Sequence, residues 1–177
     1  MSEQSERSYQ RKLQEHIESC GYFHLVQSPD AGLARSRKKD DFGLARDGQY
    51  HACELKQVHG TEWAWPFRKL EDHQEEWLLD AVKKGNYGWV FVHHVAQLSK
   101  ANYKKLGIAQ YDRLWVLPIN MVLVARDIDG LGGLQPLLLD VYGTCVAKGA
   151  AFNHRAFIHA THHYPFTLDQ AVERKRT

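Results

Sequence analysis

Asp41, Glu54 and Lys56 have the residue types and spacing that metal-assisted chemistry on a phosphodiester requires. In a β-strand, side chains two positions apart lie on the same face, so a strand through Glu54 and Lys56 presents both to one side. The dipeptide Asp47-Gly48 separates this strand from an apolar run that begins at Asp41, and it strongly favours a tight hairpin. The hairpin folds Asp41 back towards Glu54, so the sequence predicts two carboxylates and one lysine on one face of a sheet.

Carboxylate oxygens are the ligands that Mg²⁺ and its substitute Mn²⁺ prefer. A metal ion held by Asp41 and Glu54 would activate a water molecule and polarise the oxygens of a phosphodiester. Lys56 would orient or deprotonate that water, or stabilise the negative charge that develops on the phosphate. The alternative is structural, because Glu-x-Lys in a strand commonly forms a solvated cross-strand ion pair.

Hydrophobic spacing predicts the elements that must position these residues. In the first half we expect helices over 6–20 and 67–84, strands over 22–27, 41–46, 50–58 and 87–95, and a tryptophan-rich loop over 59–65. In the second half we expect a short basic helix over 99–106, a loop over 129–133, and strands over 113–117, 120–126, 137–147 and 155–160. This layout indicates a mixed α/β (α+β) fold, with a central β-sheet flanked by helices.

Four short motifs in this layout resemble the PD-(D/E)xK nuclease superfamily, and within it the RecU-type Holliday-junction resolvases. They are Asp41-Phe42-Gly43, Cys53-Glu54-Leu55-Lys56-Gln57, Pro66-Phe67 and Asp72-His73-Gln74. The resemblance covers residues 9–95. It implies a restriction-endonuclease-like core, a Mg²⁺-dependent endonuclease, and a homodimer that makes paired nicks in four-way DNA junctions.

The resemblance also implies roles for particular residues. Asp41, Glu54 and the backbone carbonyl of Leu55 would bind metal, Lys56 would be the catalytic lysine, and Gln74 would take part beside His73. Glu15 is a further candidate metal ligand, since the family's first-helix glutamate falls at Gln14 or Glu15. The sequence departs from the family in its shortened segment before Asp41, and Asp40 leaves the register of that ligand open.

Basic and aromatic residues around these motifs are candidates for DNA contact. A cluster of four positive charges precedes Asp41 and would grip phosphates, and its members are Arg35, Arg37, Lys38 and Lys39. A second group would stack on unpaired bases or contact the backbone, and it comprises Trp63, Arg68, Lys69 and His73. The alternatives are a solvated loop for the basic cluster, and core packing for Trp65 and Phe67.

Composition limits the class of protein. With 177 residues we expect one domain over 1–177, with a motif-bearing core at about 9–95 and additional strands and helices over 96–177. The net charge of +2 is too small to indicate nucleic-acid binding by itself. The three cysteines lack the spacing of a disulfide framework or zinc site, and we expect reduced thiols. Without a signal peptide or an apolar run long enough to span a bilayer, we expect a cytoplasmic protein, in the host cytoplasm if a phage encodes it.

Three other functions stay open at this stage. The same residues would serve a nuclease that acts on flaps, single strands or linear duplex. A non-catalytic DNA-binding module could use the same scaffold, although such a module commonly lacks one of the site residues. A partner-binding protein could use the tryptophan-rich loop as its interface.

Overall fold

The computed structural model describes residues 3–26, 42–60, 62–97, 110–149 and 151–176. Its core is a seven-stranded sheet in the order β1-β2-β3-β5-β6-β8-β9, in which β3 and β5 are parallel and the other neighbours antiparallel. The strands are β1 His24–Val26, β2 Phe42–Arg46, β3 Gln49–Gly60, β5 Tyr87–Gln97, β6 Gln110–Pro118, β8 Thr144–Lys148 and β9 Ala151–Phe152. Two short strands, β4 Trp65–Pro66 and β7 Gly133–Leu134, form a second sheet.

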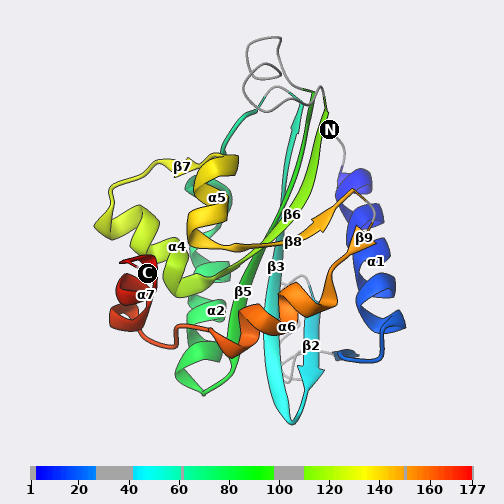
Figure 1. The fold of residues 1–177 in the computed structure, drawn as a ribbon, viewed down its shortest axis with the longest axis horizontal. Helices are drawn as coiled ribbons and strands as arrows, with labels where there is room; N and C mark the ends of the chain where they lie inside the picture. Colours follow the sequence, from blue (N-terminus) through cyan, green and yellow to red (C-terminus); the bar gives the residue numbers. More distant parts are fainter. Residues whose placement is uncertain (1–2, 27–41, 61, 98–109, 150, 177) are drawn as a thin grey trace.

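Helices cover both faces of the large sheet (Figure 1). They are α1 Glu3–Ser19, α2 Asp72–Lys83, α4 Ile119–Leu123, α5 Pro136–Tyr142, α6 His154–His162 and α7 Leu168–Arg176, with a 3₁₀ turn η1 Phe67–Lys69 and a π-helical turn η2 Val124–Ile128. The prediction of a mixed α+β fold with a central sheet flanked by helices is therefore confirmed. In this part of the chain, no helix is long and apolar enough to cross a membrane.

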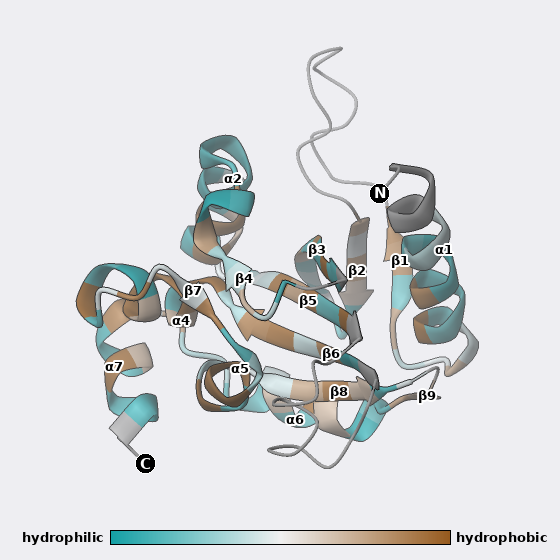
Figure 2. Ribbon diagram, turned by 90° about the horizontal axis from the view of Figure 1, so that it is seen from above, coloured by the Kyte–Doolittle hydropathy of each residue, from teal (hydrophilic) through white to brown (hydrophobic). Residues whose placement is uncertain are grey.

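Two hydrophobic clusters separate the two faces of the sheet. On one face, Ala52 and Val58 of β3 pack with α2, α4, α5 and α7. On the other face, Cys53 and Leu55 pack with α1 and α6. Figure 2 shows mostly hydrophobic colour in the middle of the sheet, whereas α1 and α2 carry both hydrophilic and hydrophobic colour. Alternation along β3 thus assigns even-numbered residues to the α2 face and odd-numbered residues to the α1 face.

The β2–β3 hairpin forms at the predicted turn. Asp47 and Gly48 both have positive φ, 51° and 78°, which is the backbone conformation of a two-residue type I′ turn. Arg46 pairs with Gln49 beside the turn, and the register continues to Phe42 opposite Cys53. The hairpin prediction is confirmed.

The helix predicted over 67–84 begins later than expected, at Asp72. Leu70 is extended, with φ −90° and ψ 114°, and it separates η1 from α2. Glu71 is the N-cap of α2, and its backbone N–H donates to the side chain of Gln74. The predicted loop over 59–65 is also partly wrong, because β3 extends to Gly60 and β4 begins at Trp65.

Two strands predicted in the second half are wrong, and a third is only partly right. Residues 120–126 form α4 and η2, and residues 155–160 lie in α6. The range 137–147 divides between α5, which ends at Tyr142, and strand β8, which begins at Thr144. Residues 119–122 are all buried, and an apolar run buried on every side has no periodicity that separates helix from strand. In α6 the side chain of Asn153 caps the helix by accepting a hydrogen bond from the N–H of Ala156, 3.1 Å away. The helix predicted over 99–106 lies outside the described residues.

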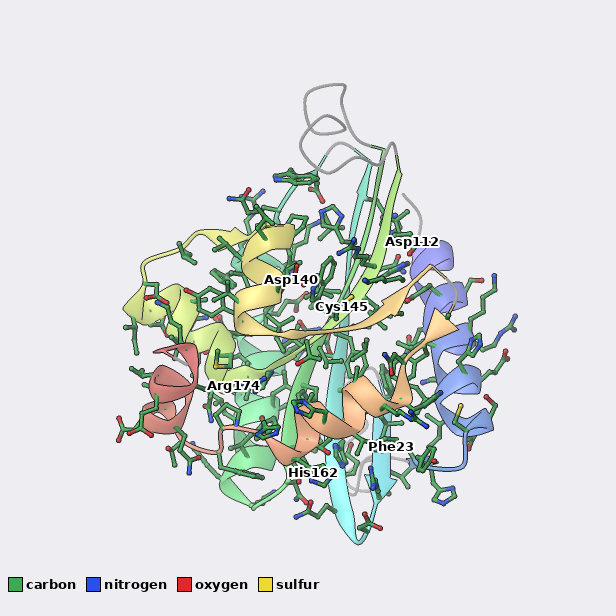
Figure 3. The ribbon with its side chains drawn as sticks, viewed as in Figure 1. Phe23, Asp112, Asp140, Cys145, His162 and Arg174 are labelled. Carbon is green, nitrogen blue, oxygen red and sulfur yellow. The ribbon has the colours of Figure 1, made fainter. Side chains whose placement is uncertain are left out.

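The additional elements close the second half onto the sheet. Trp115 of β6 is fully buried, and its indole N–H donates to Asp140 across 2.8 Å. Figure 3 labels Asp140 on α5. The C-terminal Arg174-Lys175-Arg176 belongs to α7, where Arg174 donates to the carbonyl of His163 and Lys175 pairs with Asp129. The three cysteines are free thiols; Cys53 is buried, and Cys20 and Cys145 are half-buried.

Candidate active site

Glu54 and Lys56 lie side by side on the face of β3 that α2 covers. The Lys56 ammonium nitrogen is 2.8 Å from Oε1 of Glu54, and the two side chains are 12% and 4% exposed. A carboxylate this deeply buried requires a charged or hydrogen-bonding partner. The pair is therefore a built feature of the interior and not the solvated cross-strand ion pair considered as the alternative.

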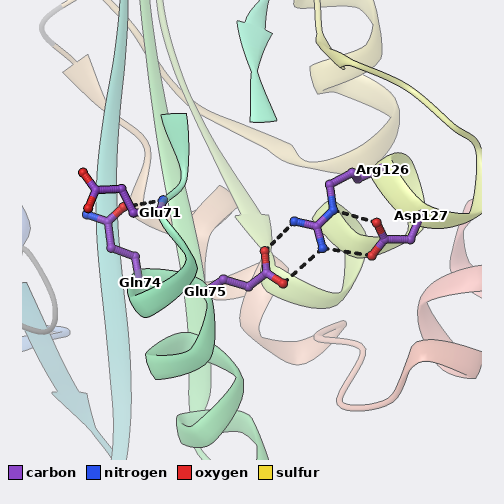
Figure 4. A network of polar contacts seen from close by, with 5 residues as sticks. All are labelled: Glu71, Gln74, Glu75, Arg126 and Asp127. Carbon is purple, nitrogen blue, oxygen red and sulfur yellow. Dashed lines mark hydrogen bonds and ion pairs between the residues drawn. The ribbon is translucent and has the colours of Figure 1, made fainter. Parts of the chain in front are cut away.

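Gln74 from the first turn of α2 completes a triangle with this pair. Its side-chain nitrogen Nε2 donates to Oε1 of Glu54 across 2.5 Å, and its Oε1 accepts from Lys56 across 2.7 Å. The same Oε1 accepts the backbone N–H of Glu71 across 3.0 Å (Figure 4). Both ends of the amide are thus in use, which fixes its orientation. The first turn of α2 also brings the positive end of a helix dipole towards the Glu54 carboxylate.

An Arg–carboxylate fork holds the same turn of α2 to the second half of the chain. Arg126 of η2 contacts both carboxylate oxygens of Glu75, at 2.5 and 3.1 Å, and it also contacts Asp127 (Figure 4). The hydrogen bonds to Asp127 and Glu75 raise the pKa of the Arg126 guanidinium above its ordinary value. The sequence offered no signal for this contact, because the partners are 51 residues apart.

Several residues expected at the site lie outside the described residues: Asp41 and the basic cluster Arg35, Arg37, Lys38 and Lys39. The described part of β2 begins at Phe42, which is the register partner of Cys53. The chain neighbours of Asp41 and Glu54 are therefore paired. Leu55, whose backbone carbonyl was the third expected ligand, lies in β3 opposite Phe91 of β5 and buries its side chain on the α1 face.

Glu15 lies apart from the triangle. It belongs to α1, which packs on the opposite face of the sheet through Leu13 and Ile17. Its side chain is 69% exposed and pairs with Arg11 one turn earlier, at 3.7 Å. The structure does not bring Glu15 to Glu54.

The residues expected to contact DNA have mixed surroundings. Arg68 is exposed, His73 is half-buried beside Glu71, and Lys69 pairs with Glu62 at 2.6 Å. Trp63 is half-buried, and its indole N–H donates to Gln135 across 3.0 Å. Trp65 and Phe67 are buried and pack against each other, so for these two the core-packing alternative is correct.

The triangle is compatible with Mg²⁺ on chemical grounds. Mg²⁺ is usually held by one or two carboxylates, with water and substrate phosphate as its other ligands, so Glu54 provides the hard oxygen donor that such a site needs. Within the described ranges, no group of three or more His, Cys, Asp or Glu side chains could hold a metal ion. The second carboxylate in the expected pair, Asp41, lies outside those ranges.

No protein-family model matches this chain, and no curated protein is significantly similar to it. The resemblance to the nuclease superfamily therefore stays an expectation from the motif residues alone.

A second polar network, which the sequence did not predict, lies on the α1 face. His93 of β5 bonds to Asp112 through Nε2 at 3.0 Å and to Gln57 through Nδ1 at 3.2 Å, and the ring of Tyr9 stacks on it with centroids 3.5 Å apart. Gln57 in turn bonds to His59 at 2.6 Å. Burial lowers the pKa of His93 to about 4, although Asp112 opposes the shift, so the imidazole is neutral at pH 7. Strand alternation places this network on the face away from Glu54.

Proposed function

We propose that this protein is a metal-dependent DNA endonuclease, and specifically a Holliday-junction resolvase that makes paired nicks in four-way junctions. The observation that carries the proposal is the buried triangle of Glu54, Lys56 and Gln74. Its members come from two separate motifs of the nuclease pattern, 18 residues apart or more, and they meet at hydrogen-bonding distance. This meeting supports the proposal, because the nuclease pattern expects all three residues at one site.

Each residue has a defined task in the proposed reaction. Glu54, together with Asp41 and the carbonyl of Leu55, would hold Mg²⁺, or Mn²⁺ in its place. When bound, the metal ion supplies charge stabilisation for the phosphate and acidifies its water ligand. Lys56 donates hydrogen bonds towards the attacking water or the phosphate oxygen on which negative charge develops. Gln74 holds the Lys56 ammonium and the Glu54 carboxylate at fixed positions.

The DNA-binding surface is proposed around the first turn of α2. Arg68 is exposed and precedes this turn in the chain, and His73 is half-buried within it. The basic cluster Arg35, Arg37, Lys38 and Lys39 precedes Asp41 in the chain. Phosphate contacts by such residues make DNA affinity fall steeply with salt. A homodimer with two-fold symmetry would present two equivalent sites to the two equivalent strands of a four-way junction.

The test is cleavage of an end-labelled four-way junction, compared with a linear duplex and a splayed arm of matched sequence. Each substrate is incubated with Mg²⁺ and with EDTA, using the unmodified protein and the Glu54→Gln and Lys56→Ala variants. Glu76→Gln serves as the control, because Glu76 is an exposed carboxylate on α2. We expect paired nicks in opposing junction strands that disappear with EDTA and with either site variant, and persist in the control.

Other results would replace the proposal. Equal cleavage of all three substrates would retain the nuclease and remove the junction specificity. Tight DNA binding without cleavage under Mg²⁺ or Mn²⁺ would indicate a non-catalytic DNA-binding module. Cleavage that survives both Glu54→Gln and Lys56→Ala would place the active site elsewhere.

A further inference from the structure

The Arg126–Glu75 fork attaches to the turn of α2 that carries Gln74. Glu75 directly follows Gln74 in the first turn of α2, so the fork fixes the backbone that carries the Gln74 amide. Two parallel N–H···O bonds between guanidinium and carboxylate define both distance and angle, which a single contact does not. The fork therefore restrains rotation as well as displacement of this turn.

The element that supplies Arg126 is itself unusual. Arg126 lies in η2, a five-residue π-helical turn that continues α4. A π-helical turn is less favourable than regular helix and is found frequently at functional sites. The two residues before Arg126, Val124 and Ala125, are buried, so the start of η2 is anchored in the core. The guanidinium is also held by Asp127, whose carboxylate is 2.6 Å from Nε.

We propose that Arg126 is a positioning residue for the candidate active site. It acts through Glu75 on the first turn of α2, and this turn holds the amide of Gln74 between Glu54 and Lys56. Without the fork, the turn keeps its buried anchors Trp77 and Leu78 and its capping contacts between Glu71 and Gln74, but it loses its tie to η2. The role as a positioning residue in catalysis rests on the proposed nuclease function, whereas the effect on Gln74 does not.

The first experiment measures the position of Gln74 without any assay of activity. The side-chain NH₂ resonances of Gln74 are observed by ¹H–¹⁵N NMR in the unmodified protein and in Arg126→Met. We expect the fork's loss to shift these resonances and to speed their exchange with solvent at least several-fold. Arg46→Met is the matched control, since Arg46 also pairs with its chain neighbour, Asp47, at 3.0 Å, and lies at the β2–β3 turn. Unchanged Gln74 resonances in a folded Arg126→Met protein would overturn the proposal.

The second experiment is a double-mutant cycle on the cleavage rate, with Arg126→Met, Gln74→Ala and the combined variant. A displacement of about 1 Å at a catalytic group costs on the order of 100-fold in rate, so we expect Arg126→Met to lower kcat by about 10- to 100-fold. The KM for DNA should stay unchanged, and Arg126→Lys should restore part of kcat. Because Arg126 acts through Gln74, the combined variant should be no slower than Gln74→Ala alone.

The outcomes separate this inference from the proposed function. If the effects of Arg126→Met and Gln74→Ala on kcat multiply, Arg126 does not act through Gln74 and the inference is wrong. If KM rises instead of kcat falling, Arg126 belongs to DNA binding and the inference is also wrong. If the unmodified protein cleaves no DNA, the proposed function fails, and the NMR comparison alone decides whether Arg126 positions Gln74.

Discussion

Acidification should destabilise this protein through His51. The side chain lies at the start of β3 and is 2% exposed. Its Nδ1 accepts a hydrogen bond from the indole N–H of Trp89 across 3.1 Å, and the ring of Tyr87 stacks on it at 4.2 Å. Burial, and secondarily the positive charge of Arg46, lower the pKa of His51 from 6.5 to about 3. The folded protein therefore keeps His51 neutral over a pH range in which the unfolded chain protonates it.

The sign and size of the effect follow from this difference in pKa. Below pH 6.5 the unfolded state binds a proton that the folded state does not, so the free energy of unfolding decreases as the pH falls towards 3. One proton costs about 1.4 kcal/mol per pH unit. Between pH 7 and pH 5, His51 alone should therefore remove about 2 kcal/mol from the free energy of unfolding, an appreciable fraction of the stability of an ordinary domain.

Urea unfolding followed by tryptophan fluorescence at pH 7 and pH 5 measures this loss. The informative variant is His51→Gln, because the glutamine oxygen can still accept from Trp89 but does not titrate. Whatever its absolute stability, this variant should lose about 2 kcal/mol less than the unmodified protein between the two pH values. The control His162→Gln removes an exposed histidine that lines the same pocket as His51, and it should not change the difference. A pH dependence that is the same with and without His51 would refute the reasoning.

Three further changes test the packing described above. Trp65→Ala removes a fully buried ring of β4 and should lower the free energy of unfolding by about 3–5 kcal/mol in urea titrations. Gly88→Ala places a methyl group 2.5 Å from the carbonyl oxygen of Leu78, so it should cost about 1–3 kcal/mol and shift the NMR signals of α2. Tyr164→Phe removes a buried hydroxyl that donates to the carbonyl of Gly88 and accepts from its N–H; the loss should be about 1–3 kcal/mol in the same titrations, and an unchanged urea midpoint would contradict it.

Local sequence patterns were sufficient to predict the part of the candidate site that lies within a few residues of a recognisable turn. The Asp47-Gly48 turn and the alternation along β3 correctly placed Glu54 and Lys56 on one face. The position of Gln74 beside them was expected from the resemblance to the nuclease family. Its physical cause is the crossover connection between the parallel strands β3 and β5, which contains α2. Such a crossover lays α2 across the face that Glu54 and Lys56 occupy.

Other features depend on contacts between distant segments, which local signals do not encode. The Arg126–Glu75 fork joins an arginine to one of several acidic residues of α2. No local sequence pattern indicates that these two residues pair. The helix α4 and the turn η2 were predicted as a strand because their apolar residues are buried all round. The expected metal role of Glu15 assumed that α1 faces Glu54, whereas α1 packs on the opposite face through Leu13.

The cluster on the α1 face also has a consequence for protein synthesis. Phe23 and Phe91 pack there against Phe157, which enters the chain only with α6. A nascent polypeptide that has already emerged past Phe91 therefore still exposes these two aromatic rings until α6 is made. Premature termination after residue 95 should release a fragment that aggregates or is degraded, because the segment up to that residue cannot bury its own aromatic rings.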